Sequence, residues 1–242
     1  GITQRMLFPF ASRIFVSFEK TRGAIDPSRK RVVGNPVRGN ILAVSGRPDE
    51  KQAEKTEKKD RLTILVLGGS QGAHALNQAM TNALCHLEPL SRLRVVHQTG
   101  EKDQDAVAAA YARHGVEAEV EVFFHDMAAC YQQTDLVICR AGATTIAELA
   151  ALGKPAIFVP YPFAADNHQE HNARFLVDQG AGRMILEKDL TGPALAGEIN
   201  EMAASPDLLA RMADGIRRLG RPDAAEKIVE DCCQLLKAGA CT

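Results

Sequence analysis

The strongest constraint on the fold is an alternation that begins at Arg61: short apolar runs of β-rich composition follow one another, separated by segments of helical composition. The expected strands are Leu62–Leu67, Leu93–His97, Ala118–Phe123, Asp135–Cys139, Pro155–Val159 and Gly182–Leu186. The expected helices are Ala73–Leu87, Asp103–His114, Met127–Thr134, Thr144–Leu152 and His168–Gln179. Strands that are apolar throughout are typical of sheets covered on both faces. The sequence therefore predicts an α/β fold with a doubly wound parallel sheet.

After Leu186 the composition becomes helical, and we expect helices at Gly192–Ala204, Pro206–Leu219 and Pro222–Leu236. The last two begin with proline, which is favoured in a first helical turn. The segment Pro222–Leu236 carries apolar residues at helical spacing, so one of its faces needs a partner.

The first forty residues do not resemble the start of a fold. Leu7–Phe18 fits an amphipathic helix, and Arg31–Val33 fits a short strand that leads into the sequence GNPVR. One strand and one helix cannot bury a core. We therefore expect this segment to pack on the main domain or on a missing one. The charged stretch Arg47–Arg61 is interpreted as a solvated loop without function.

Composition excludes several classes of protein. The chain has 242 residues, and its 29 basic and 30 acidic side chains leave a formal charge of −1, so it lacks the basic footprint of a nucleic-acid-binding protein. The length allows one domain or one and a half. No apolar run is long enough to span a membrane, and no signal peptide is recognisable. Six scattered cysteines without a C-x-x-C pair indicate a reduced, cytoplasmic protein with no metal site.

A glycine-rich loop follows the first expected strand, with Gly68, Gly69, Ser70 and Gly72 directly before a helix. Adjacent glycines let a ligand approach the backbone, and a helix N-terminus presents free N–H groups and a positive dipole end. The loop therefore suits a diphosphate, although a tight turn alone would need one glycine. It matches neither the Walker pattern nor G-x-G-x-x-G.

A second junction of the same kind follows the fourth strand, where Gly142 precedes a helix that begins with small and hydroxyl-bearing residues. Ligands of open α/β sheets bind beyond the carboxyl ends of the strands, so both glycine loops converge on one site. Glu148 lies about one turn into the helix. It fits equally well a ribose-binding carboxylate and a carboxylate that only stabilises the helix.

A third segment, Val159–Ala173, leaves the fifth strand through two prolines and opens a helix with polar residues. His168 and His171 are three positions apart, but they lack a third metal ligand, so we interpret them as surface or substrate-contacting residues. Gln169 is a neutral hydrogen-bonding residue that suits sugar hydroxyls.

Three further positions lie near this edge. The backbone after Phe123 is placed to read a base, whereas Phe123 itself fits core packing. Arg38 is suited to bidentate contact with a phosphate but also fits a plain surface position. His97 has no carboxylate partner in the sequence and is not assigned a catalytic role.

The motifs GGSQGA, HQTG, CRAGATTIAELAALGKPAIFVPYP and HQEHNA, in this order, resemble the donor-binding half of the MurG family. These are UDP-N-acetylglucosamine:undecaprenyl-pyrophosphoryl-muramoyl-pentapeptide N-acetylglucosaminyltransferases of peptidoglycan synthesis. The resemblance is dense from Val32 to Leu186. It implies the C-terminal half of a GT-B glycosyltransferase, Rossmann-like, inverting and independent of metals and cofactors.

The resemblance also implies roles for single residues. Arg38 and Ser70 would contact the donor diphosphate, beside the loop glycines Gly68, Gly69 and Gly72. The backbone at Phe124 would read uracil, and Glu148 would hold the ribose hydroxyls. His168 or Gln169 would hold the N-acetylglucosamine. The segment that would cradle the nucleotide comprises Ala143, Thr144, Thr145, Ile146, Ala147 and Glu148.

The family's acceptor domain carries a glycine-rich loop with a histidine proposed as the general base and a membrane-contacting hydrophobic patch, and neither occurs in these 242 residues. We therefore expect residues 1–38 to be a remnant of that domain, residues 39–220 the donor domain, and residues 221–242 a helix that returns to the acceptor domain. The catalytic base and contact with the membrane and the undecaprenyl-linked acceptor would then lie outside this chain, which would be inactive alone. Two alternatives are a donor subunit of a two-chain glycosyltransferase and a non-catalytic UDP-sugar-binding module.

Overall fold

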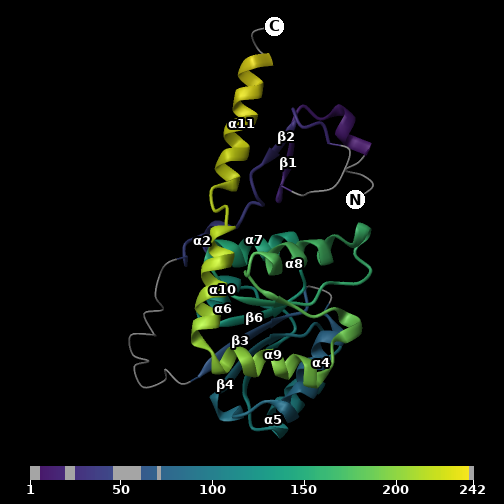
Figure 1. Cartoon of the computed structure of the whole chain (residues 1–242), viewed down its shortest axis with the longest axis vertical. Helices are drawn as coiled ribbons and strands as arrows, with labels where there is room; N and C mark the ends of the chain where they lie inside the picture. The colour runs from purple at the N-terminus through teal and green to yellow at the C-terminus, as the bar shows by residue number, and fades with distance from the viewer. Residues whose placement is uncertain (1–5, 20–24, 46–60, 70–71, 240–242) are drawn as a thin grey trace.

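The structure is a computed structural model that describes residues 6–19, 25–45, 61–69 and 72–239. Its centre is a six-stranded parallel sheet in the order β5-β4-β3-β6-β7-β8 (Figure 1). The strands are β3 (Leu62–Leu67), β4 (Leu93–Gln98), β5 (Glu117–Glu121), β6 (Leu136–Cys139), β7 (Ala156–Phe158) and β8 (Arg183–Met184). The chain runs outward from β3 to β5 and then returns to the middle of the sheet to add β6 to β8. The predicted doubly wound α/β fold is confirmed.

Helices cover both faces of the sheet. They are α2 (Gly39–Leu42), α4 (His74–Ala83), α5 (Gln104–Arg113), α6 (Met127–Gln132), α7 (Ala143–Leu152), α8 (His168–Asp178), α9 (Gly192–Ala204) and α10 (Pro206–Arg218). Alternate residues of β3 point to opposite faces. Ile64 and Val66 join the core under α4, α5 and α9, whereas Leu65 and Leu67 join the core under α6, α7 and α8. The apolar side chains of an inner strand therefore pack into two cores, one on each face of the sheet.

The edge strand β5 departs from the expected all-apolar pattern. Its sequence alternates glutamate with smaller residues, and Glu117, Glu119 and Glu121 are exposed. Arg94 of the neighbouring strand lies 3.4 Å from Glu117 and 3.5 Å from Glu119. Charges of this kind on an edge strand oppose pairing with other chains.

The N-terminal segment forms a separate two-stranded parallel sheet, in which β1 (Ile14–Val16) pairs with β2 (Lys30–Val32). The expected helix over Leu7–Phe18 is wrong, because helical structure ends in the short 3-10 turn Phe8–Phe10 and Ile14–Val16 form a strand. Pro9 lacks a backbone N–H, and the β-branched Ile14 and Val16 favour a strand. The expected short strand near Arg31–Val33 is confirmed.

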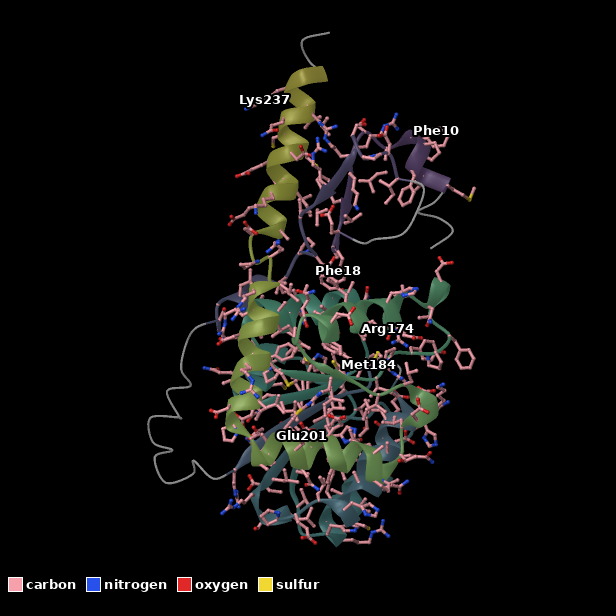
Figure 2. The ribbon with its side chains drawn as sticks, viewed as in Figure 1. Phe10, Phe18, Arg174, Met184, Glu201 and Lys237 are labelled. Atoms are coloured by element: carbon pink, nitrogen blue, oxygen red, sulfur yellow. The ribbon has the colours of Figure 1, made fainter. Side chains whose placement is uncertain are left out.

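The small sheet lies beside the last helix, α11 (Ala224–Gly239), which projects away from the main domain (Figure 1). Arg13 Nε lies 3.2 Å from Asp231 Oδ2 and joins the small sheet to this helix. Phe18 lies where the small sheet meets the main domain, and its ring centroid is 5.5 Å from that of Phe175 on α8 (Figure 2). Among the described helices, none combines the length and the apolar character needed to cross a bilayer.

Candidate functional site

The carboxyl ends of β3 and β6 lie side by side at the point where the strand order reverses, since Leu67 is in register with Cys139. A crevice at such a reversal is where open α/β sheets bind ligands. The two glycine loops predicted from the sequence follow these two strands and therefore flank the reversal. The tertiary structure thus brings both loops to one edge of the sheet.

The loop after β3 requires glycine for steric reasons. Gly72 has φ +73°, and a Cβ atom there would lie 2.5 Å from the carbonyl oxygen of Thr99. A Cβ atom at Gly68 would lie 2.6 Å from the backbone nitrogen of Ala73, and Gly69 has φ +83°. The loop leads into the N-terminus of α4 without a side-chain cap. Ser70 lies outside the described residues, so its diphosphate contact stays a prediction.

Gln98, at the end of β4, joins this loop to the segment after β5. Its Nε2 donates to the carbonyl oxygen of Gly69 at 3.1 Å, and its Oε1 accepts from the backbone N–H of Phe124 at 3.0 Å. Phe124 is buried in the core, while Phe123 is exposed, which reverses the expectation that Phe123 packs inside. The sequence analysis did not single out Gln98, because its partners lie 29 and 26 positions away.

Glu148 is a buried carboxylate at this edge that has a hydrogen-bond partner on each of its oxygens. It lies in α7 with only 5% of its surface exposed. Its Oε1 accepts from Arg38 Nη2 at 3.2 Å, and its Oε2 accepts from the hydroxyl of Tyr131 at 2.9 Å. Arg38 precedes α2, and Tyr131 belongs to α6. The structure therefore unites Arg38 and Glu148, both predicted site residues, and adds Tyr131, which the sequence analysis missed.

Tyr131 remains a hydrogen-bond donor at this position. Burial, followed by the negative charge of Glu148, raises the pKa of Tyr131 well above 10. A tyrosine that keeps its proton can only donate toward a carboxylate oxygen. The bond between Tyr131 and Glu148 thus compensates part of the cost of burying a carboxylate.

The other residues of the segment predicted to hold the nucleotide, 143–147, differ from one another in exposure. Ile146 packs into the core beneath α7, so its side chain faces away from the site edge. Thr144 is exposed, and its Oγ1 accepts from Asn35 Nδ2 at 3.3 Å. The half-buried positions are Ala143, Thr145 and Ala147. The segment that contains Arg38 therefore contacts α7 at two points, through Asn35 and through Arg38 itself.

Gln169, in the first turn of α8, holds two loop ends together. Its Oε1 accepts from the backbone N–H groups of Ala141 at 3.2 Å and Tyr161 at 3.0 Å. Two N–H partners identify this atom as the oxygen, so the amide nitrogen faces elsewhere and makes no hydrogen bond within the described part of the chain. Exposed His168 binds the carbonyl oxygen of Ala165 through Nδ1 at 2.8 Å.

Arg140 also contacts the loop that follows β7. Its guanidinium donates to the carbonyl oxygens of Val159 and Pro160, lies 2.5 Å from Glu187 and stacks 5.5 Å from the ring centroid of Tyr161. Its guanidinium is therefore committed to these protein partners. Among the described residues, no three His, Cys, Asp or Glu side chains gather as metal ligands.

His97 belongs to a buried network rather than to the site edge. Its Nε2 faces Asn77 Oδ1 at 3.0 Å, and its Nδ1 faces the hydroxyl of Tyr111 at 2.8 Å. An amide oxygen can only accept, so Nε2 carries the proton and Nδ1 accepts from Tyr111. Burial lowers the pKa of His97 to about 3, so the ring stays neutral. The network joins β4 to α4 and α5.

Comparisons with known proteins agree with this architecture. Residues 63–228 match the family described as "Glycosyltransferase family 28 C-terminal domain". The chain is 45% identical over 233 residues to the UDP-N-acetylglucosamine--N-acetylmuramyl-(pentapeptide) pyrophosphoryl-undecaprenol N-acetylglucosamine transferase of Geotalea daltonii, with 96% of this chain and 62% of that protein covered. The enzyme of the same name from Geobacter metallireducens is also 45% identical, with 96% and 63% covered. The chain thus spans about three fifths of the length of these relatives.

Solved structures show the same relationship. The crystal structure of Acinetobacter baumannii MurG superposes with a TM-score of 0.77 at 35% identity, covering 95% of this chain and 62% of that one. Anabaena HepE, solved with UDP and glucose, has a TM-score of 0.60 at 16% identity over 96% of this chain and 66% of that one, and shares the fold alone. The chain therefore belongs to glycosyltransferase family 28 through that family's C-terminal domain, and it resembles the C-terminal part of MurG.

Proposed function

We propose that this chain binds UDP-N-acetylglucosamine and supplies the donor half of an enzyme that transfers N-acetylglucosamine to a lipid-linked muramoyl-pentapeptide in peptidoglycan synthesis. The names of its 45%-identical relatives describe that reaction. The observation that carries the proposal is the contact between Arg38 and Glu148 at the strand-order reversal. This contact brings together the cation that we assign to the diphosphate and the carboxylate that we assign to the ribose.

The phosphate end of the donor would lie over the loop after β3. The loop glycines Gly68, Gly69 and Gly72 leave the backbone open, and the N-terminus of α4 offers N–H groups and a positive dipole end. Arg38, whose side chain is 58% exposed, can reach a phosphate without unfolding its surroundings. Ser70 is the expected hydroxyl donor in this loop.

The N-acetylglucosamine and the uracil of the donor would contact the loops on either side of the phosphate site. The amide nitrogen of Gln169 is the group that best fits an N-acetylglucosamine hydroxyl, with exposed His168 beside it. The uracil would meet the backbone at Phe124, where recognition through the N–H requires an exchange with Gln98. The nucleotide between them would lie along the start of α7, from Ala143 to Glu148.

The chemistry is a single displacement at the anomeric carbon. The C4 hydroxyl of the muramoyl acceptor forms a bond to that carbon, the bond from the carbon to the diphosphate oxygen breaks, and UDP leaves. The hydroxyl proton passes to a base that we place outside this chain. Arg38 and the N-terminus of α4 stabilise the charge that develops on the leaving UDP. The reaction in this form uses neither a metal nor a cofactor.

The remaining segments would serve the acceptor half. Within the described part of residues 1–38, β1 and β2 form a sheet that does not join the main one, and Arg13 binds Asp231 on α11. These contacts support a unit in which residues 1–38 and 221–242 pack with acceptor-binding residues, while residues 39–220 bind the donor. We place the complete enzyme on the cytoplasmic face of a bacterial membrane, which it would touch through the acceptor half.

Calorimetry with the 242-residue chain tests donor binding. Titration with UDP and with UDP-N-acetylglucosamine should show saturable binding, and Glu148→Ala should weaken it by roughly 10- to 100-fold, because it removes hydrogen bonds to a charged group. Glu117→Ala, which removes an exposed glutamate from the edge strand, serves as the matched control and should leave the affinity unchanged. Failure to bind UDP at millimolar concentration would overturn the proposal. Without an acceptor half, we expect binding but no transfer.

A further inference from the structure

The two oxygens of Glu148 are held by partners of very different exposure. Tyr131, which binds Oε2, is 1% exposed and packs in the core beneath α6 and α7. Arg38, which binds Oε1, has a side chain that is 58% exposed. A buried ring in a packed core keeps its position, whereas an exposed arginine exchanges partners readily. We therefore expect the bond from Tyr131 to persist and the bond from Arg38 to exchange.

The backbone of α7 cannot turn the carboxylate to another side. Ile146 and Leu149, which flank Glu148 in this helix, are both buried in the same core cluster as Tyr131. Rotation of α7 would pull these apolar side chains out of the core. The carboxylate is thus oriented by two constraints, the packed helix and the hydroxyl of Tyr131.

A carboxylate has about four acceptor positions, two on each oxygen. Tyr131 uses one of the two on Oε2, and Arg38 uses one on Oε1. Departure of Arg38 toward a phosphate would free Oε1, while Oε2 would remain tied to Tyr131. The carboxylate would then present Oε1 and the outer position of Oε2 to a pair of neighbouring hydroxyls.

We propose that Tyr131 is a positioning residue for donor recognition: its hydroxyl holds Glu148 Oε2 so that Oε1, now bound by Arg38, is offered to the ribose diol of a uridine nucleotide. Donor binding then exchanges the partners of Oε1. Arg38 moves from Glu148 to the diphosphate, and the diol takes its place. This inference rests on the proposed function, since it assigns Glu148 to the ribose.

The test compares UDP with 2′,3′-dideoxy-UDP, which lacks the two hydroxyls. We expect Tyr131→Phe to weaken UDP binding about tenfold, because a hydrogen bond to a charged group is lost. The same variant should change binding of 2′,3′-dideoxy-UDP less than twofold. Equal losses for both ligands would make Tyr131 a merely structural residue, and unchanged UDP binding would remove it from recognition. Either result overturns the inference.

The matched control is Tyr111→Phe. Tyr111 is equally buried, and its hydroxyl binds His97 Nδ1 at 2.8 Å rather than a carboxylate at the site edge. This variant also loses one buried hydroxyl bond, but it should bind both ligands like the unmodified chain. A loss of UDP affinity in Tyr111→Phe as large as in Tyr131→Phe would trace the effect to stability and overturn the inference.

A second measurement does not depend on the folding of Tyr131→Phe. The chain has three tyrosines, so 3-fluorotyrosine labelling gives three ¹⁹F resonances, and Tyr111→Phe and Tyr161→Phe assign the third by elimination. The Tyr131 resonance should shift differently with the two ligands, because both carry the diphosphate that draws Arg38 away but only UDP brings the diol. The same response to both ligands, or to neither while UDP binds, would overturn the inference.

Failure of the proposed function and failure of the Tyr131 role give different binding results. If the unmodified chain does not bind UDP, the proposed function fails and the inference with it. If the unmodified chain binds UDP and 2′,3′-dideoxy-UDP equally, donor binding stands, but Glu148 does not hold the diol and the inference is wrong.

Discussion

Arg38 and Glu148 are 110 positions apart in the sequence, yet Nη2 of the arginine lies 3.2 Å from Oε1 of the glutamate. The arginine comes from the segment that leads into α2, and the glutamate from α7. Arg38 is mostly exposed, so solvent screens its attraction to the carboxylate, whereas Glu148 is buried and depends on its partners. The contact also brings two predicted site residues together at this edge of the sheet.

Replacing Arg38 should weaken phosphate binding specifically. Arg38→Ala is expected to lower the free energy of unfolding by about 1–3 kcal/mol, because one oxygen of the buried Glu148 loses its partner. It should weaken UDP binding roughly tenfold without weakening uridine binding, because uridine carries no phosphate. Calorimetry with both ligands measures this difference. Arg61→Ala is the control, because it breaks an arginine–glutamate pair at the amino-terminal ends of the strands, away from the site. It should leave the affinities for UDP and uridine unchanged. Equal weakening of UDP and uridine by Arg38→Ala would contradict the phosphate role.

Gly72 tests the steric argument for the loop. Its φ of +73° disfavours any side chain, and an added Cβ atom would lie 2.5 Å from the carbonyl oxygen of Thr99. Gly72→Ala should lower the free energy of unfolding by about 1–3 kcal/mol, measured by urea denaturation. Gly197→Ala is the counterpart, because Gly197 lies within α9 with open space around its Cα. That change should raise stability by about 0.5–1 kcal/mol. A neutral Gly72→Ala would refute the close approach.

The buried His97 predicts how stability depends on pH. The pKa of its imidazole is about 3 in the folded chain and near 6.5 when unfolded. Between these values the unfolded chain binds more protons, so the free energy of unfolding rises with pH. The stabilisation is fully present above pH 6.5 and is lost as the pH falls toward 3, with a slope of at most about 1.4 kcal/mol per pH unit.

His97→Gln tests whether His97 causes this pH dependence of the free energy of unfolding. Its amide can donate to Asn77 and accept from Tyr111, as the neutral ring does, but it does not titrate in this range. Urea denaturation between pH 4 and 7 should therefore show a flatter dependence for His97→Gln than for the unmodified chain. Parallel curves for the two proteins would mean that His97 does not stay neutral in the fold.

Gln98 links two loops that the sequence separates. Gln98→Leu leaves the carbonyl oxygen of Gly69 and the N–H of Phe124 without their partner. The N–H of Phe124 is buried whereas Gly69 is exposed, so the main cost comes from one unpaired buried group. We expect a loss of about 1–3 kcal/mol in urea denaturation and weaker UDP binding in calorimetry. Gln104→Leu removes a single hydrogen bond to Val120, and it should cost less than half as much. Equal costs in the two variants would contradict the linking role of Gln98.

Strand and helix positions were largely predictable because the local pattern of apolar residues decides them. The strand Leu62–Leu67 and the helix Gly192–Ala204 occur with the expected bounds. The prediction failed at Leu7–Phe18, where helical spacing competed with a proline and with β-branched residues. It also failed to separate the edge strand β5 from the inner strands, because strand order, not local sequence, determines which strand lies at the edge.

The candidate site was only partly predictable. The glycine loops, Arg38, Glu148 and Gln169 carry signals that a sequence shows directly. Their hydrogen-bond partners do not, and the three clearest cases are Tyr131 for Glu148, Gln98 for Phe124 and Gly69, and the backbone of Ala141 and Tyr161 for Gln169. A buried tyrosine and a strand-end glutamine look like ordinary core and loop residues until their neighbours are known.

The sequence by itself therefore determined the alternating strands and helices, the glycine-rich loop that contains Gly72 and the family of this domain. Only the tertiary structure decided that the strand order reverses between β3 and β6. It also decided that Arg38 and Tyr131 each bind one oxygen of Glu148. The physical reason is that periodicity and backbone strain act over a few residues. A contact across 110 positions depends on strand order and on which face each helix buries.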